Sequence, residues 1–269
     1  MKKLQKTVLI TGASSGMGRA TATLLAKRGF TVYAGSRTPE KLEEIEGVTP
    51  LKLDLTEPNH IAEVISHIEP IDILINNAGY GLVSTVEEVS EEEMLAQFNV
   101  NVFGLFRVTK AVIPQMRRAE GGVIVNISSF LGKIGLPLFT FYNASKYAVE
   151  GITDSLRYEL KDFNIRVHSI LPGFFDTEFA RSNLVTNVET FDENSPYADM
   201  VSKLTPTIVE QINGGNPVEE VAELILEIIE NENAPARLTV GERAKKFIPM
   251  RRELSDEDFE RRVREYYNL

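Results

Sequence analysis

Short apolar runs alternate with longer amphipathic segments along most of this chain, and this alternation constrains its fold more than any other feature. Most of the runs are apolar throughout, which is typical of parallel strands that helices cover on both faces. Strand and helix alternate six times in a row. We therefore predict an α/β fold with a doubly wound parallel β-sheet. The expected strands are 7–11, 31–36, 51–54, 71–76, 123–128, 165–171 and 238–240, and the expected helices lie near 16–28, 39–45, 57–69, 90–118, 142–163 and 217–232.

The alternation covers residues 1–240, which we expect to form a single domain, since α/β folds of this length often do. Within it, residues 174–216 hold no clear strand. A stretch of that length inside a compact domain is usually functional, for example as a lid. Residues 241–269 are charged, but four apolar or aromatic side chains share helical spacing there, which predicts a C-terminal helical extension that caps the domain. A helix at a membrane surface is the alternative.

Composition excludes several classes of function. The formal net charge is −10, from 29 basic and 39 acidic residues, which argues against nucleic acid as a main partner. There is no cysteine and the three histidines are scattered, so we expect no disulfide and no metal site. The apolar run after the N-terminal lysines is too short for a signal peptide. No stretch approaches the ~20 apolar residues of a membrane span, so we expect a cytoplasmic protein.

A glycine-rich turn, Thr-Gly-Ala-Ser-Ser-Gly-Met-Gly at residues 11–18, joins the first expected strand to the first helix. Gly12 would make the tight turn, while Gly16 and Gly18 would let a pyrophosphate and the helix approach the backbone closely. Free amides at a helix start also favour phosphate. A structural loop is the alternative. The turn predicts a dinucleotide site formed by Gly12, Ser14, Ser15, Gly16, Met17 and Gly18.

The end of the second expected strand indicates which dinucleotide binds. A site for NAD usually has an acidic residue about 20 positions beyond the glycines, bonded to the ribose 2′-hydroxyl. Here Ser36 and Arg37 end the strand, and no acid precedes Glu40. Because a guanidinium fork suits a 2′-phosphate and a serine can add a hydrogen bond, we predict NADP(H) rather than NAD(H). There are two alternatives to this interpretation. Arg37 is an ordinary surface residue, or Glu40 forms an ion pair with Arg37 and weakens the preference for NADP(H).

A serine, a tyrosine and a lysine suggest acid–base chemistry. Ser129 follows the fifth expected strand, while Tyr142 and Lys146 lie one turn apart on the next long helix. A free tyrosine titrates near ~10, and a neighbouring ammonium lowers that pKa toward the range where proton transfer works. The strand end and the helix start fall at the carboxyl edge of the sheet, where ligands bind in open α/β folds. Ser128 is the alternative to Ser129.

With these features the chain resembles the short-chain dehydrogenase/reductase family in its single-domain, Rossmann-type form. The resemblance runs from Thr7 to about Val240 and includes several motifs in the expected order. It implies that residues 1–240 form a dinucleotide-binding and catalytic domain and that 174–216 form a substrate-loop lid. The matching positions are residues 11–18, Asp54 and Leu55, Asn76 to Gly79, Asn99 to Val102, Ser129, Tyr142, Lys146, Pro172, Gly173 and Thr177.

The resemblance also implies roles for these residues. Tyr142 would be the acid–base on the substrate oxygen, Ser129 would hydrogen-bond that oxygen, and Lys146 would bind the nicotinamide ribose and lower the pKa of Tyr142. Asn101, which fits the family pattern better than Asn99, would hold a water that links Lys146 to solvent. The other implied cofactor contacts are Asp54 and Leu55 beside the adenine, Asn77, Ala78 and Gly79 along the adenosine, and Pro172, Gly173 and Thr177 at the nicotinamide. The alternative for Asn76 and Asn77 is that they stabilise the end of a central strand.

The expected activity is hydride transfer between NADP(H) and a carbonyl or secondary alcohol. Apolar side chains crowd the segment between Ser129 and Tyr142, so we expect a lipophilic substrate. The resemblance leans toward steroid- and retinol-dehydrogenase-like members. A non-catalytic NADP(H)-sensing regulator and an epimerase or dehydratase of the same family are the alternatives. The long helices near 90–118 and 142–163 resemble the usual interface of the family, so we expect a homodimer or homotetramer.

Overall fold

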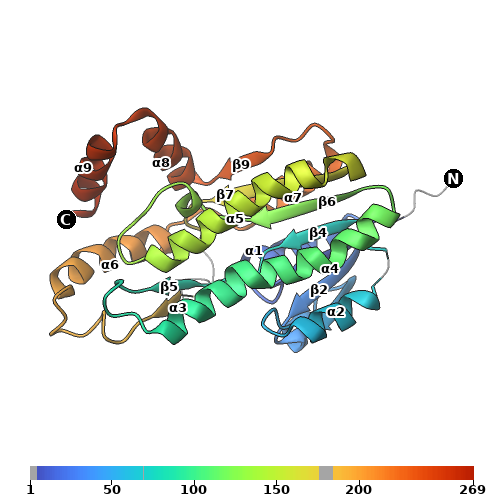
Figure 1. Cartoon of the computed structure of the whole chain (residues 1–269), viewed down its shortest axis with the longest axis horizontal. Coiled ribbons are helices and arrows are strands. Elements are labelled where there is room, and N and C mark those ends of the chain that lie inside the picture. The colour runs from blue at the N-terminus through green and yellow to red at the C-terminus, as the bar shows by residue number, and fades with distance from the viewer. Residues whose placement is uncertain (1–4, 69, 176–183) are drawn as a thin grey trace.

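The computed structural model describes residues 5–68, 70–175 and 184–269 (Figure 1). Its central sheet has seven parallel strands in the order β3-β2-β1-β4-β6-β7-β9, which confirms the predicted doubly wound fold. The order of the strands reverses between β1 and β4, so the crevice that binds ligands in such sheets lies above these two strands. The strands are β1 (Thr7–Thr11), β2 (Thr31–Ser36), β3 (Val48–Lys52), β4 (Ile73–Asn76), β6 (Gly122–Ile127), β7 (Ile165–Pro172) and β9 (Arg237–Val240).

Helices bury both faces of the sheet, as the apolar strands predict. Along β1, Val8 and Ile10 pack into the core beneath α1 (Gly16–Lys27) and α7 (Glu219–Glu230). Leu9 points to the opposite face because side chains alternate along a strand. The helices on that second face are α2 (Pro58–Ser66), α4 (Leu105–Arg118) and α5 (Thr140–Glu159), of which α4 and α5 cross in front of the sheet in Figure 1.

Three expected elements differ from those observed. Strand β3 begins before the expected 51–54 and contains Pro50, which is tolerated because β3 is an edge strand. The expected helix at 39–45 is only a 3₁₀ turn, η1 (Pro39–Leu42). The expected helix at 90–118 is interrupted: α3 (Glu91–Phe98) is joined to α4 by a π-helical turn, η2 (Asn99–Gly104). Single π turns of this kind are frequent at functional sites.

The region 174–216, expected to lack strands, contains a strand and a helix in its described part. Strand β8 (Leu184–Thr186) pairs in parallel with β5 (Gly81–Val83), and α6 (Ala198–Asn213) follows. Pro206 lies inside α6, although a proline in a helix interior removes a backbone hydrogen bond. Apolar side chains at helical spacing override the proline, since they bury one face of α6; they are Val201, Leu204, Ile208 and Ile212.

Two helices complete the chain, α8 (Glu242–Glu253) and α9 (Asp256–Tyr267), and they form a hairpin beyond the end of the sheet (Figure 1). Phe259, Val263 and Tyr267 of α9 are buried in one apolar cluster with Phe130 and Phe247. The remaining short turns are η3 (Phe130–Gly132) and η4 (Lys161–Phe163). No helix in the described ranges is sufficiently long and apolar to cross a membrane.

A buried polar network fixes the strand ends beneath the ligand crevice. The Asn76 amide donates to Thr109 Oγ1 and to Asn126 Oδ1, each at 2.9 Å. Asn126 in turn donates to Thr153 Oγ1 at 2.9 Å. The network links β4 and β6 to α4 and α5, which is the strand-stabilising role considered for Asn76.

Candidate active site

A cavity of about 660 Å³ opens at the carboxyl edge of the sheet. Its lining comes from the residues that directly follow β1, β2, β4, β6 and β7, as the position of the crevice requires. Ligand pockets of this size are common for small molecules and cofactors. Among the residues expected in the site, those that line the cavity are Gly12, Ser14, Ser15, Gly16, Met17, Ser36, Arg37, Asp54, Leu55, Asn77, Ala78, Gly79, Ser129, Tyr142, Lys146, Pro172 and Gly173.

The glycine turn adopts the conformation that its sequence predicts. Gly12 has a φ of 64°, and a Cβ there would lie 2.7 Å from the Ala78 Cα. Helix α1 begins at Gly16, and the side chain of its N-cap residue Ser15 makes no capping hydrogen bond. Ser15 therefore leaves the backbone amides of the first turn of α1 free to bind another group. Free amides at a helix N-terminus favour an anion, and residues of this turn line the cavity. This arrangement fits a pyrophosphate.

Asn77 holds the turn together in addition to lining the cavity. Its side-chain amide donates to the carbonyl oxygens of Thr11 at 3.0 Å and Gly12 at 2.9 Å. A Cβ on Gly18 would come within 2.5 Å of that same amide nitrogen. Gly18 therefore does not line the cavity as expected; its missing side chain makes room for Asn77.

At the end of β2, Arg37 is exposed on the cavity wall beside buried Ser36. Among the described residues Arg37 forms no ion pair, so Glu40 does not compete for it. Its charge acts on Asp54, although burial and the hydrogen bonds from Thr56 affect the pKa of that carboxyl more, and the pKa is lowered overall. The guanidinium is thus available to an anionic group at this end of the cavity.

Ser129 and Tyr142 meet at the opposite end of the cavity. A hydrogen bond between the two side chains lowers the pKa of Tyr142, but burial acts more strongly and raises it to about 12. The expected lowering of the tyrosine pKa is therefore not found. The Ser129 oxygen also accepts a hydrogen bond from the amide of Leu131 at 3.1 Å. Ser128 Oγ is buried with no partner among the described residues, so the geometry favours Ser129.

Lys146 lies one helical turn beyond Tyr142 and is buried. Its ammonium donates to the carbonyl oxygen of Ile127 at 2.8 Å and lies 5.7 Å from the centre of the Tyr142 ring. Burial lowers the pKa of Lys146 to about 8, although the nearby Glu150 carboxylate opposes this change. The lysine therefore gains or loses its charge close to the physiological range.

Asn101 lies in the π-helical turn, 2% exposed and behind the cavity lining. Its amide nitrogen donates to the Tyr80 carbonyl at 2.9 Å and to Ser145 Oγ at 3.1 Å, and its oxygen accepts from the Tyr80 amide at 3.0 Å. A Cβ on Gly79 would touch both Asn101 Oδ1 and Lys146 Nζ, at 3.1 and 3.7 Å. Asn101 thus stands next to the lysine, whereas Asn99 is bonded to Arg107.

Some residues that line the cavity were not predicted from the sequence. Tyr80 positions Asn101 and follows the Asn77–Gly79 motif directly, which was the available signal. Leu184 and Ile212 line the substrate end from β8 and α6, in the region read as a loop. The apolar spacing of residues 201–212 would have revealed α6. Thr177, expected at the nicotinamide, lies outside the described residues.

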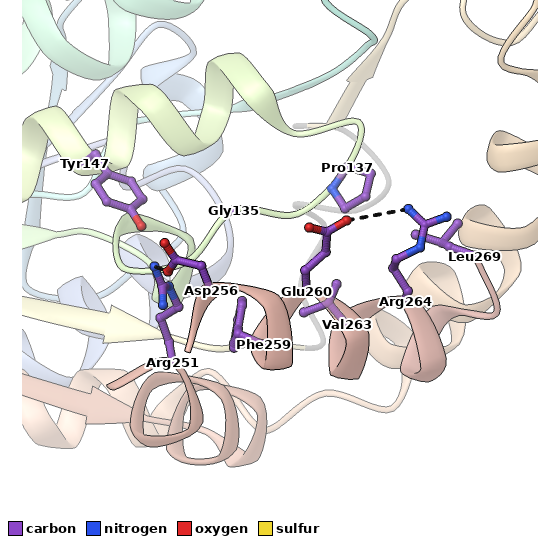
Figure 2. A pocket seen from close by; sticks show the side chains of 10 residues that line it. All are labelled: Gly135, Pro137, Tyr147, Arg251, Asp256, Phe259, Glu260, Val263, Arg264 and Leu269. Carbon is purple, nitrogen blue, oxygen red and sulfur yellow. Dashed lines mark hydrogen bonds and ion pairs between the residues drawn. The ribbon is translucent and has the colours of Figure 1, made fainter. Parts of the chain in front are cut away.

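A second cavity, of about 380 Å³, lies beside the C-terminal hairpin, away from these residues (Figure 2). Arg251 pairs with Asp256 at 2.5 Å, and Arg264 lies 3.9 Å from Glu260. The charged side chains of its wall thus have partners of opposite sign. No cluster of potential metal ligands occurs in residues 5–68, 70–175 and 184–269.

The family model described as short chain dehydrogenase matches residues 6–187. The chain belongs to the short-chain dehydrogenase family. It is 39% identical over 238 residues to a 3-ketodihydrosphingosine reductase from Bacteroides thetaiotaomicron, and the match covers 87% of each protein. This short-chain dehydrogenase is therefore an oxidoreductase.

Solved structures of short-chain dehydrogenases agree with its fold. One from Streptomyces avermitilis is 32% identical with a TM-score of 0.84, over 98% of this chain and 97% of the other. Another, from Burkholderia cenocepacia in complex with NADP, is 27% identical with a TM-score of 0.77, over 96% and 97% of the two chains.

Proposed function

We propose that this short-chain dehydrogenase uses NADPH to reduce the carbonyl group of a lipophilic substrate, and that it catalyses the reverse oxidation of the secondary alcohol. The observation that carries this proposal is the meeting of Tyr142, Ser129 and Lys146 in the cavity whose other end holds Arg37. When bound, the cofactor supplies the hydride. The protein must then hold the carbonyl and provide the proton.

Tyr142 is the proton donor in this proposal. Because its pKa is raised to about 12, the hydroxyl carries its proton at neutral pH, as an acid in the reductive direction must. The Ser129 hydroxyl, which is bonded to Tyr142, is placed to hydrogen-bond the same substrate oxygen. Proton transfer by a positioned side chain typically accelerates a reaction by ~100- to 10,000-fold.

Lys146 and Asn101 support the proton donor. An ammonium close to Tyr142 stabilises the phenolate that remains after proton transfer. Asn101 anchors the loop of Tyr80 beside this lysine, where it would hold a water that links Lys146 to solvent. The role of Asn101 is the one that the family resemblance implies, and Lys146 would in addition bind the nicotinamide ribose, as the resemblance also implies.

The preference for NADPH rests on Arg37 and Ser36. An exposed guanidinium without an ion-pair partner in the described residues can give a 2′-phosphate a forked, charge-assisted hydrogen bond. The first turn of α1 would hold the pyrophosphate, and Asp54 and Leu55 would flank the adenine. The relative from Burkholderia cenocepacia, which was crystallised with NADP, supports this choice.

The substrate end of the cavity is apolar, which supports a lipophilic ketone. Leu82, Leu131, Phe174, Leu184 and Ile212 line it. The relative named for 3-ketodihydrosphingosine, a ketone on a long alkyl chain, favours such a substrate over the steroid or retinol class. All three classes belong in a substrate screen.

We also propose a homo-oligomer, with an interface smaller than the sequence suggested. Val149, Ile152 and Leu156 of α5 are buried in the protein's own core and cannot contact a partner. Phe103, in the π-helical turn η2, and Phe106, at the start of α4, are however 47% and 46% exposed. Exposed phenylalanines one turn apart favour an interface between copies of the chain.

The test is NADPH consumption, followed by its absorbance, with a panel of alkyl ketones, ketosphingoid bases, steroids and retinal. Turnover with at least one ketone and formation of the matching alcohol are expected. Cofactor binding without turnover of any carbonyl would instead support the sensing regulator. A product at the oxidation level of the substrate would support an epimerase or dehydratase.

A further inference from the structure

The 660 Å³ cavity that contains Tyr142 is called the catalytic cavity below. A third cavity, of about 460 Å³, adjoins its apolar end. Its wall is apolar except for Thr186, Thr205 and Asn213, and it lies between α6, β8 and the segment that precedes α5. Apolar space of this size is normal for a ligand and unusual for a packed protein interior, where voids larger than a water are few.

The small sheet of β5 and β8 separates the two cavities. Leu82 and Val185 are register partners, and both line the catalytic cavity. The next pair, Val83 and Thr186, lines the third cavity instead. Because neighbouring side chains in a strand point to opposite faces, the sheet forms a partition with one face toward each cavity.

Phe139, Leu184 and Ile212 line both cavities and so form the boundary between them. The ring of Phe139 packs edge-on against Tyr142, with 6.3 Å between the ring centres. The alkyl chain of a molecule whose carbonyl lies at Tyr142 would therefore enter the third cavity beside Phe139. The neighbouring Leu138 has a φ of 66°, a strained conformation for a leucine of the kind that clusters at ligand sites.

We infer that this third cavity binds the alkyl chain of a ketone substrate and makes the enzyme selective for long chains. The inference rests on the proposed function, since the carbonyl must lie at Tyr142. The chemistry of the wall fits this occupant: it offers no charged side chain to a polar tail, and it continues the apolar lining of the catalytic cavity. Val209, which is 48% exposed, and the exposed Thr186 form the outer rim of the third cavity. An alkyl chain can therefore enter this cavity without unfolding of the protein core.

Chain length is the first test. NADPH-dependent reduction is measured for unbranched methyl ketones from 2-butanone to 2-dodecanone. The burial of each added methylene should raise kcat/KM by about fourfold until the cavity is full, after which the values level off. A series that is flat from the shortest ketone onward would overturn the inference but leave the proposed reductase intact.

Substitutions at the rim of the third cavity test whether the alkyl chain binds there. Thr186→Trp and Val209→Trp place a large ring in the third cavity at two exposed positions, so folding should be preserved. Each should lower kcat/KM for 2-decanone by about tenfold, mainly through KM, and leave 2-butanone within about twofold. The matched control is Val188→Trp, which changes an 84% exposed valine close to Thr186 that lines neither cavity. Equal losses for both ketones, or the same change in the control, would refute the assignment.

Binding separates this inference from the proposed function. If no ketone is reduced, the reductase proposal fails, and calorimetry of 2-decanol and 2-butanol with the NADP⁺-loaded chain then decides about the cavity. The inference predicts that 2-decanol binds more tightly and that Thr186→Trp removes the difference. Equal affinities of the two alcohols for the wild type would overturn it.

Discussion

Glu150 of α5 accepts a 2.7 Å hydrogen bond from Nε of Arg237, the first residue of β9. The carboxylate is one turn beyond Lys146 and is 3% exposed, and Lys133 lies 3.0 Å from it. The pair therefore joins the helix that carries Tyr142 and Lys146 to the last strand of the sheet. The pair thereby fixes the position of α5 relative to the sheet.

Removal of this carboxylate should destabilise the fold. Glu150→Ala removes the buried partner of Arg237, which is itself 29% exposed and keeps Asp154, so the loss should be about 1.5–3 kcal/mol, the usual contribution of a hydrogen bond to a charged group. Asp154→Ala is the matched control, because Asp154 pairs with the same arginine but is half exposed, so its loss should cost less than about 1 kcal/mol. Urea denaturation measures both. Similar losses for the two variants would contradict a dominant role for Glu150.

The pH profile should report Lys146. Burial lowers its pKa to about 8, so the ammonium is present below this pH and is lost as the pH rises through it. Because the phenolate formed at Tyr142 needs that charge, kcat/KM for ketone reduction should fall above pH 8. The residual activity of Lys146→Met should lack this fall. A wild-type profile that stays flat well above pH 8, or a variant that keeps the fall, would show that another group titrates.

We expect the choice between NADPH and NADH to depend on Arg37. Hydrogen bonds to charged groups contribute about 1.5–3 kcal/mol, so NADPH should bind roughly 10- to 150-fold more tightly than NADH. Arg37→Ala should remove most of that difference with little change in the affinity for NADH. Arg28→Ala, which removes an exposed charge at the far end of α1, is the control. Fluorescence titration measures the affinity of each variant for NADPH and NADH. If Arg37→Ala kept the full preference for NADPH, the 2′-phosphate would have to bind elsewhere.

The exposed phenylalanines should mediate self-association. Phe103→Glu and Phe106→Glu put a charge on each apolar contact and should convert the oligomer to a monomer, while Val188→Glu, at a remote exposed valine, should not. Light scattering at micromolar concentration gives the mass. A monomeric wild type would refute the oligomer, and an oligomer that survives both substitutions would move the interface away from α4.

Local patterns predicted much of the framework. The bounds of β1 and β2 agree residue by residue with the expected strands, because apolar runs that end in glycine or serine leave little freedom. The glycine turn was equally predictable, since Gly12 must have a positive φ and lies against Ala78. These features depend on short-range chemistry, which a sequence displays directly.

Tertiary packing decided what the sequence did not reveal. The apolar spacing of residues 201–212 indicated a helix, but Pro206 argued against it, and the contacts that outweigh the helix-breaking effect of this proline come from distant parts of the chain. Strand β8 has only three residues, which is too short to show the sequence pattern of a strand. Its partner β5 lies about a hundred positions earlier in the chain. The pKa of Tyr142 was expected to be low from its distance to Lys146 alone, whereas burial of the hydroxyl raises it.

The central claim is that Tyr142 supplies the proton during hydride transfer, and Tyr142→Phe tests it most directly. Phenylalanine keeps the ring, and its contact with Phe139, but has no proton to give. Single-turnover reduction of a ketone by the NADPH-loaded variant should be ~100- to 10,000-fold slower than for the wild type, with NADPH affinity almost unchanged. A variant that binds NADPH normally and reduces the ketone at the wild-type rate would contradict the account.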